Sequence, residues 1–146
     1  MAALNSHGAK TQASHDRGIV VNGSGGYVAE QGSEYLPGIS AETVGAKFIW
    51  LGVATIPPGV RTKAHVHERH ETAFYMLSGD ELELWTGDHL QHRDVVRPGD
   101  YLFIPANVLH VAVNRSAVPA VFVGARNEPT AQESVVMYPE MDAKVP

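Results

Sequence analysis

A chain of 146 residues is long enough for one domain with a well-buried core. Its net charge of −5 at pH 7 argues against nucleic-acid binding, since such proteins usually carry a basic face. No apolar stretch approaches the roughly 20 residues of a membrane helix, so we expect no membrane partner. The chain has no cysteine, which excludes disulfides and thiolate metal sites.

The two ends differ in composition from the body of the chain. Residues 1–26 begin with a polar segment that predicts a flexible arm without a secretory signal, and residues 139–146 predict a short tail. Residues 27–138 show no repeat or linker and predict a single domain. These features favour a cytoplasmic protein and a homodimer, in which the subunits cover each other's strand edges.

The body of the chain is predicted to be β-structure almost throughout. Runs rich in β-branched, aromatic or alternating residues end at Gly, Pro or Asp turns. The predicted strands, in chain order, are residues 47–56, 72–77, 81–85, 90–97, 101–104, 109–114, 119–125 and 134–137. Residues 35–44 are irregular, with at most one helical turn, and are expected to cover a cavity mouth or to pack on a partner subunit. Short strands at regular spacing indicate an all-β sandwich or barrel.

Six of the eight histidines lie between residues 65 and 110. His65 and His67 are two residues apart, so on a strand both imidazoles point to the same face. Glu71 follows four residues later, and His110 begins the predicted strand after Pro105. Three neutral imidazoles and one carboxylate suit Fe²⁺, Mn²⁺, Ni²⁺, Co²⁺ or Zn²⁺. An isolated His-x-His pair is more often solvated, so the metal hypothesis depends on the surrounding residues.

Those residues resemble the two motifs of the cupin superfamily, in particular its single-domain, quercetin dioxygenase-like members. The motifs run G-x5-H-x-H-x(3,4)-E-x6-G and G-x5-P-x-G-x2-H-x3-N. The matching positions are Gly59, His65, His67, Glu71, Gly79, Gly99, Pro105, His110 and Asn114. The resemblance implies an antiparallel β-barrel, the double-stranded β-helix or jelly roll, that binds a divalent ion, with Fe²⁺ or Mn²⁺ favoured over Ni²⁺, Co²⁺ or Zn²⁺.

The sequence departs from these motifs at two places. Asn107 stands where the second motif has its inner glycine, and asparagine tolerates left-handed backbone better than most residues. The first motif has one residue too many before Gly79, so counting back from this glycine puts Thr72 in the acid position. We expect a bulge or a longer turn to absorb the extra residue, with Glu71 as the fourth ligand. His70 is the alternative fourth ligand, and Thr72 is a poor ligand for a divalent ion.

The resemblance implies above all a dioxygenase, a metal-dependent oxidoreductase that acts on a small molecule. A metal-assisted isomerase or lyase of a sugar-like or small organic acid substrate is a second hypothesis, and a non-catalytic binding protein is a third, because fold does not determine function. No catalytic side chain is assigned beyond the metal ligands. Arg126, Asn127 and Glu128 follow a predicted strand, where they either bind an anionic group at the barrel mouth or form a solvated strand end.

Overall fold

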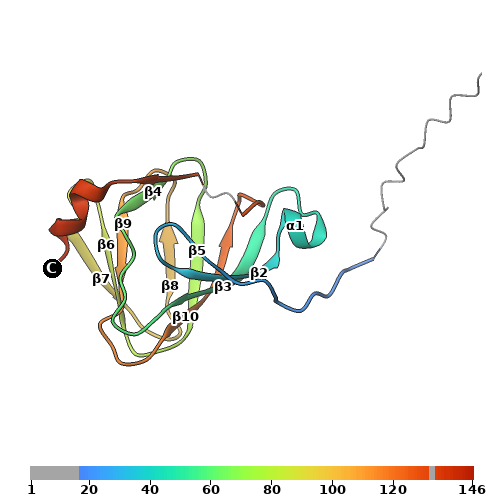
Figure 1. Ribbon diagram of the computed structural model, residues 1–146, viewed down its shortest axis with the longest axis horizontal. Helices are drawn as coiled ribbons and strands as arrows, with labels where there is room; N and C mark the ends of the chain where they lie inside the picture. The colour runs from blue at the N-terminus through green and yellow to red at the C-terminus, as the bar shows by residue number, and fades with distance from the viewer. Residues whose placement is uncertain (1–16, 132–133) are drawn as a thin grey trace, which may run out of the picture.

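Two antiparallel sheets face each other in the computed structural model, which describes residues 17–131 and 134–146 (Figure 1). The first sheet has the order β1-β2-β3-β10-β5-β8, with bounds β1 Tyr27–Val28, β2 Glu34–Ile39, β3 Trp50–Ile56, β10 Ala120–Arg126, β5 Thr72–Ser78 and β8 Tyr101–Ile104. The second has the order β11-β4-β9-β6-β7, with bounds β11 Val135–Met137, β4 His65–His67, β9 His110–Val113, β6 Leu82–Thr86 and β7 His92–Val96. The predicted all-β class is confirmed.

The hydrophobic core lies between the inner faces of the two sheets. On β3, Trp50, Ala54 and Ile56 are buried while Leu51 is exposed, as the period-two alternation of a strand requires. The buried core cluster draws side chains from both sheets, and it comprises Tyr35, Trp50, Ala54, Ile56, Met76, Leu82, Leu84, Val96, Ile104, Ala120 and Phe122. These side chains hold the sheets together, and several of them, Ile56 and Phe122 included, also line the space in which the histidines lie.

Strand β5 contains the irregularity that the extra motif residue predicts. Its pairing with β10 shifts between Val121, which faces Ser78, and Phe122, which faces Met76, so Leu77 is the additional residue. The shift lies near the end of the strand. The inward alternation of Thr72 and Met76 is therefore undisturbed, and the shift does not turn the residue before Thr72 inward.

The region predicted as irregular contains a strand that the sequence pattern hides. Residues 34–39 form β2, which pairs with β3 through a register shift between Pro37 and Ile39. A proline and a glycine within the run obscured it, because both residues are rare inside regular strands. The expected helical turn is present as α1, Ala41–Val44, which Ser40 caps through its hydroxyl.

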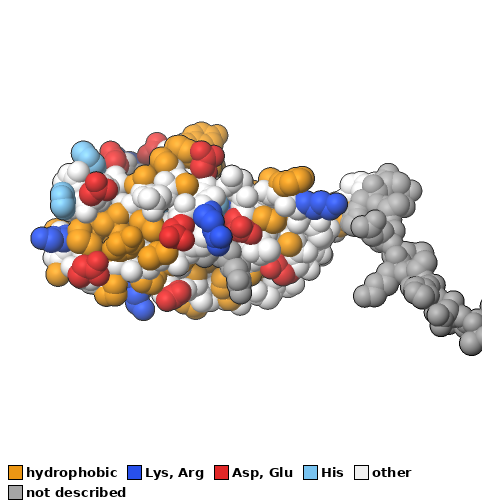
Figure 2. All heavy atoms as spheres, turned by 90° about the horizontal axis from the view of Figure 1, so that it is seen from above, with side chains coloured by type: hydrophobic (Ala, Val, Ile, Leu, Met, Phe, Trp, Pro, Cys, Tyr) orange, Lys and Arg blue, Asp and Glu red, His pale blue; other side chains and the backbone are white. Residues whose placement is uncertain are grey.

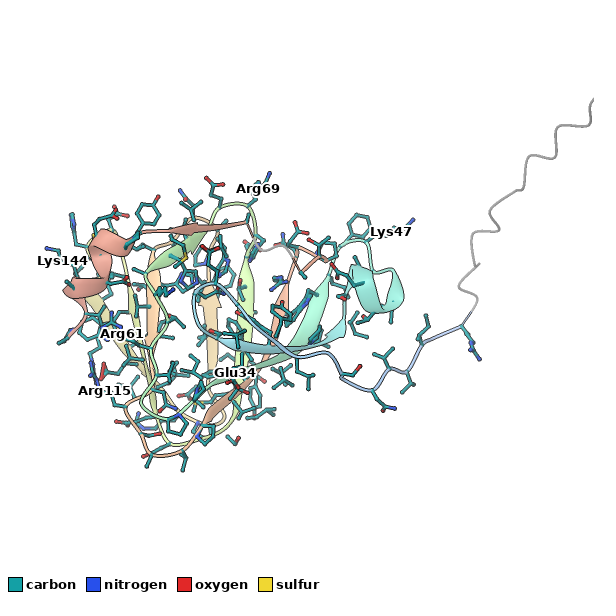
Figure 3. All side chains as sticks on the ribbon, in the orientation of Figure 1. Glu34, Lys47, Arg61, Arg69, Arg115 and Lys144 are labelled. Atoms are coloured by element: carbon teal, nitrogen blue, oxygen red, sulfur yellow. The ribbon has the colours of Figure 1, made fainter. Side chains whose placement is uncertain are left out.

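The C-terminal residues pack against the second sheet rather than extending from it. Residues 139–144 form a short 3₁₀ helix, Pro139–Lys144, and Val145 is buried in a cluster with Ala64 and Val66. Arg61 donates from its two Nη atoms to the carbonyls of Val145 and Asp142, both at 2.8 Å. Figure 3 shows Arg61 and Arg115 at this end of the molecule, beside the helix. The predicted N-terminal arm lies mostly outside the described residues.

Charged side chains are dispersed over one face of the molecule. On the face shown in Figure 2, lysine and arginine side chains stand apart from one another among acidic and hydrophobic ones. In residues 17–131 and 134–146, no helix has the length and apolar character needed to span a membrane.

Candidate metal centre

Three histidine side chains converge on the inner side of the second sheet. His65 and His67 both come from β4, and His110 comes from the first position of β9, where it pairs directly with His65. One ligand nitrogen from each residue lies within 4.8 Å of the others, and all three residues are buried. The predicted convergence of His65, His67 and His110 is therefore present in the geometry.

Backbone contacts orient two of these rings. His65 Nδ1 lies 2.6 Å from the carbonyl oxygen of Lys63, and His110 Nδ1 lies 2.9 Å from that of Val108. Because a carbonyl only accepts, each Nδ1 carries the proton and Nε2 is left with its lone pair. A hydrogen bond of this kind from the second ring nitrogen is typical of metal-ligating histidines.

A backbone contact also ties the loop before His110 to the strand that carries His67. The N–H of Asn107 donates to the carbonyl of His67 at 2.7 Å. Asn107 has a φ of 63°, in the left-handed region, which explains how asparagine replaces the glycine of the motif. This loop therefore places β9 and its histidine against β4.

Burial keeps the three imidazoles neutral. Loss of solvation lowers the pKa of His65 to about 4 and that of His110 to about 3. For His67, burial first and then the neighbouring histidines lower the pKa to about 2. Neutral imidazoles are the form that binds metal, so the donor set fits a divalent ion.

Glu71 does not join this group, contrary to the prediction that it supplies the fourth ligand. It is exposed, and its backbone N–H donates to Asn127 Oδ1 at 2.9 Å. It immediately precedes β5, in which Thr72 faces inward, so strand alternation turns Glu71 outward. Thr72, the residue that counting back from Gly79 puts in the acid position of the motif, is the one that faces inward.

His70, the alternative fourth ligand, is buried beside the centre without belonging to it. Its ring centroid lies 4.5 Å from that of His67, and Nδ1 lies 3.4 Å from Ser134 Oγ. Within the described part of the chain, the group that converges for metal binding contains only His65, His67 and His110. The geometry thus supports three histidine ligands.

A cavity lies against these histidines, between the sheets. Most of its other lining is apolar, with Ile56, Phe74 and Leu84 among the contributors. Its polar contributors besides the histidines are Gln31, Ser33, Tyr35 and Thr62. Sequence reasoning missed Gln31 and Ser33, because they lie between β1 and β2 in a segment without a recognisable motif.

Comparison with known proteins agrees with the fold of two facing sheets. The cupin domain family model matches residues 52–125, about half of the chain. The chain belongs to the cupin family. The match covers the motif residues from Gly59 to Asn114 and both strands that carry the three histidines.

Two curated cupin relatives are much longer than this chain. Quercetin 2,3-dioxygenase of Bacillus subtilis is 42% identical over 55 residues, which cover 37% of the chain and 15% of the enzyme. Germin-like protein 4-1 of Oryza sativa subsp. japonica is 30% identical over 114 residues, covering 74% of the chain and 43% of that protein. The chain therefore spans less than half the length of either relative.

Solved structures confirm the cupin-type double-stranded β-helix. A protein with a double-stranded β-helix domain from Klebsiella pneumoniae superposes with a TM-score of 0.59 at 17% identity, over 75% of this chain and 86% of that one. The oxalate decarboxylase of Lactobacillus farciminis, solved as a formate complex, superposes with a TM-score of 0.65 at 18% identity. The similarity covers 84% of this chain and 36% of the decarboxylase. At this identity the similarity concerns the fold.

Proposed function

We propose that this cupin is a metal-dependent dioxygenase that holds one divalent ion, Fe²⁺ or Mn²⁺ in preference to Ni²⁺, Co²⁺ or Zn²⁺, with His65, His67 and His110. The observation that carries the proposal is the convergence of three buried, neutral imidazoles on the wall of one cavity. When bound, such an ion supplies Lewis acidity and positions for substrate and dioxygen. Glu71 is not part of the proposed centre.

The chain's own residues provide binding and orientation. The apolar lining excludes water and favours a small substrate with an apolar body. Tyr35 and Gln31 line the cavity together, with Gln31 Nε2 placed 3.5 Å from Tyr35 Oη. Together with Ser33 they offer a few directional hydrogen bonds to substrate oxygens. The scarcity of such groups favours the dioxygenase over an isomerase of sugar-like molecules, which carry many hydroxyls.

Metal analysis of single-histidine variants tests the centre. His67→Ala and His110→Ala should each bind iron at least about tenfold more weakly than the parent, because each loses a ligand that no other histidine in the group replaces. His92→Ala is the matched control, since His92 is exposed on β7. Glu71→Ala should retain the parent's affinity. Parental affinity in His67→Ala would overturn the site assignment.

Oxygen consumption tests the reaction. The iron-loaded protein should consume dioxygen with at least one member of a panel of catechols, flavonoids and diketones, and His110→Ala should not. Substrate conversion without dioxygen would instead favour the isomerase or lyase. Ligand binding without conversion would favour the non-catalytic protein.

We further propose that the chain forms a homodimer through the outer face of the first sheet. Leu36, Val53, Val123, Tyr75 and Tyr101 are paired in one row across five neighbouring strands. An outward-facing row of this kind is usually polar when a sheet face meets solvent.

A cytoplasmic location stays a prediction from the sequence.

A further inference from the structure

Phe74 forms part of the wall between two spaces inside the barrel. It lines the cavity at the three histidines, and it also lines a second, smaller space beside Trp50 and His70. Tyr35 and His67 are the other side chains that face both spaces, and both of them contribute polar atoms. Phe74 contributes only the shape of its ring, so the size of this ring determines how far the cavity extends.

A glycine on the neighbouring strand lets the ring of Phe74 lie close to the sheet. Phe74 on β5 pairs directly with Gly124 on β10. A Cβ atom at position 124 would lie 2.5 Å from Cε1 and 2.7 Å from Cδ1 of the ring, which is closer than Cβ atoms approach their neighbours in proteins. Glycine inside a strand often marks a close approach of this kind. A side chain at position 124 would therefore push the ring off the sheet and toward the interior.

A second aromatic side chain holds the ring of Phe74 from the side. Phe122 on β10 is buried and lines the same cavity. The two ring centroids are 5.9 Å apart and the ring planes meet at 75°, which is the edge-to-face arrangement that aromatic pairs prefer. Packed side chains inside a protein occupy fixed rotamers. Contacts with Gly124 and Phe122 therefore make the ring of Phe74 a fixed wall of the cavity.

The space that these walls leave at the histidines is small. It amounts to about 50 Å³, and one water molecule needs roughly 10–15 Å³ of such space, so about three to five non-hydrogen atoms fit. For comparison, an apolar cavity that binds benzene has a volume of about 150 Å³. The cavity therefore admits the end of a short aliphatic group and has no room for an aromatic ring.

We propose that Phe74, packed against Gly124, is the specificity-determining residue of this cavity and limits the bound end of the substrate to a short aliphatic group. Small aliphatic diketones meet this limit. Catechols and flavonoids do not, because they bring an aromatic ring next to the oxygens that would bind the ion. The size limit is a property of the cavity alone, whereas its use in selecting a substrate rests on the proposed function.

Fluorobenzene and ¹⁹F NMR test the size limit without metal. The full-length, chelator-treated parent should show no saturable binding of fluorobenzene. Phe74→Ala should bind it saturably, because the ring that this substitution removes has the size of the probe. Phe48→Ala is the matched control, since Phe48 is 77% exposed before β3, and it should behave as the parent does. Saturable binding by the parent, or no binding by folded Phe74→Ala, would overturn the proposal.

Two hydroxamates with the same chelating group test the limit at the proposed metal centre. Acetohydroxamate carries a methyl group and benzohydroxamate carries a phenyl group, and visible spectroscopy follows their binding to the Co²⁺-loaded protein. The parent should bind acetohydroxamate at least about tenfold more tightly than benzohydroxamate. Phe74→Leu, a milder change that serves also if Phe74→Ala does not fold, should reduce this preference. Equal binding of the two hydroxamates by the parent would contradict the size limit.

The role of Gly124 has its own variant. Gly124→Ala should weaken acetohydroxamate binding about tenfold, because the displaced ring fills part of the cavity, and adding Phe74→Leu should restore it. Gly18→Ala is the control, since a Cβ atom there meets no atom within 4 Å. Unchanged binding in Gly124→Ala would overturn the role of this glycine. A protein that binds no Co²⁺ would contradict the metal centre, whereas the fluorobenzene measurement would still decide on the size limit.

Discussion

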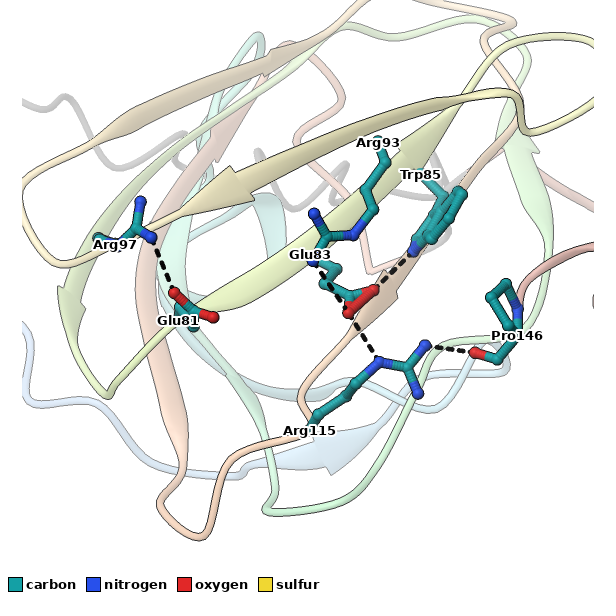
Figure 4. Close-up of polar contacts among 7 residues, drawn as sticks. All are labelled: Glu81, Glu83, Trp85, Arg93, Arg97, Arg115 and Pro146. Atoms are coloured by element: carbon teal, nitrogen blue, oxygen red, sulfur yellow. Dashed lines mark hydrogen bonds and ion pairs between the residues drawn. The ribbon is translucent and has the colours of Figure 1, made fainter.

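The carboxylate of Glu83, on β6, forms hydrogen bonds or ion pairs with three side chains on the outer side of the second sheet. Its Oε1 accepts from Arg115 Nε at 2.7 Å and lies 3.3 Å from Arg93 Nη2, while Oε2 accepts from Trp85. Arg115 also donates to the carbonyl oxygen of Pro146, as Figure 4 shows. Burial by itself would raise the pKa of Glu83, but the hydrogen bonds from Arg115, Arg93 and Trp85 outweigh it and lower the pKa to about 2.

Replacing Glu83 with Gln should therefore destabilise the protein at neutral pH. We expect the free energy of unfolding at pH 7 to fall by about 1–2 kcal/mol, because the two arginines are half exposed and solvent screens part of the interaction. Folding lowers the pKa of Glu83, so its stabilisation is complete above the ordinary value of 4.5 and disappears as the pH falls toward about 2.

Urea unfolding of both proteins from pH 7 down to pH 3.5 measures this difference. The gap between parent and Glu83→Gln should narrow once the pH falls below 4.5, the ordinary pKa of this carboxyl. Glu81→Gln is the control, since Glu81 pairs with Arg97 at 2.9 Å on a more exposed part of the surface. A constant gap, or an equal effect of both variants, would contradict the assignment.

At the scale of elements, the short strand β4 depends on the C-terminal residues. It pairs with β9 only at His65 and His110, whereas all three of its residues pair with β11. Beyond the strand, the N–H of Ala64 donates to Asp142 Oδ1 at 2.6 Å. Arg61 donates to the backbone at the C-terminal 3₁₀ helix, Pro139–Lys144. The position of His65 is therefore coupled to the end of the chain.

Arg61→Met should loosen this arrangement. It removes two charged hydrogen bonds to backbone carbonyls, so we expect a loss of about 2 kcal/mol in the free energy of unfolding. Iron affinity should fall as well, because β4 is then held less firmly. Arg69→Met is the matched control, since Arg69 is exposed beyond the end of β4. Equal stability and equal metal affinity of the two variants would show that the C-terminal helix does not support the centre.

For the whole molecule, the notable surface is the outer face of the first sheet. Tyr101 is 81% exposed and Phe103 is 58% exposed on β8, and both continue outward-facing rows from the neighbouring strands. Exposed apolar surface of this extent on a sheet is typical of an interaction site. In the proposed homodimer, a second copy of the same face would cover it without leaving a further apolar surface open.

Sedimentation should detect a dimer for the parent chain at micromolar concentration. The double variant Tyr101→Lys and Phe103→Lys should sediment as a monomer, because it places like charges opposite each other across the proposed interface. Val118→Lys is the control, since Val118 is exposed in the turn between β9 and β10. A monomeric parent, or a dimer that persists in the double variant, would overturn the proposed interface.

Local spacing in the sequence was sufficient for much of the fold and for the three proposed ligands. His65 and His67 share a face because strand residues alternate, and Asn107 adopts the left-handed backbone that its place in the motif requires. Most strands were found from short-range patterns. The exceptions were β1, which has only two residues, β2, whose proline and glycine disguise it, and β4, a three-residue strand that none of the predicted ranges contains.

Only the tertiary structure decided the surroundings of those three histidines. Whether Glu71 or Thr72 faces inward depends on the residue at which β5 begins to pair with β10, and a motif with two possible counts does not contain this information. His70 is buried yet lies apart from the convergent group, because the loop before β5 turns it toward Trp50 and Arg126. Trp50, Thr72 and Arg126 are likewise distant in sequence, and only the register of three neighbouring strands brings them together.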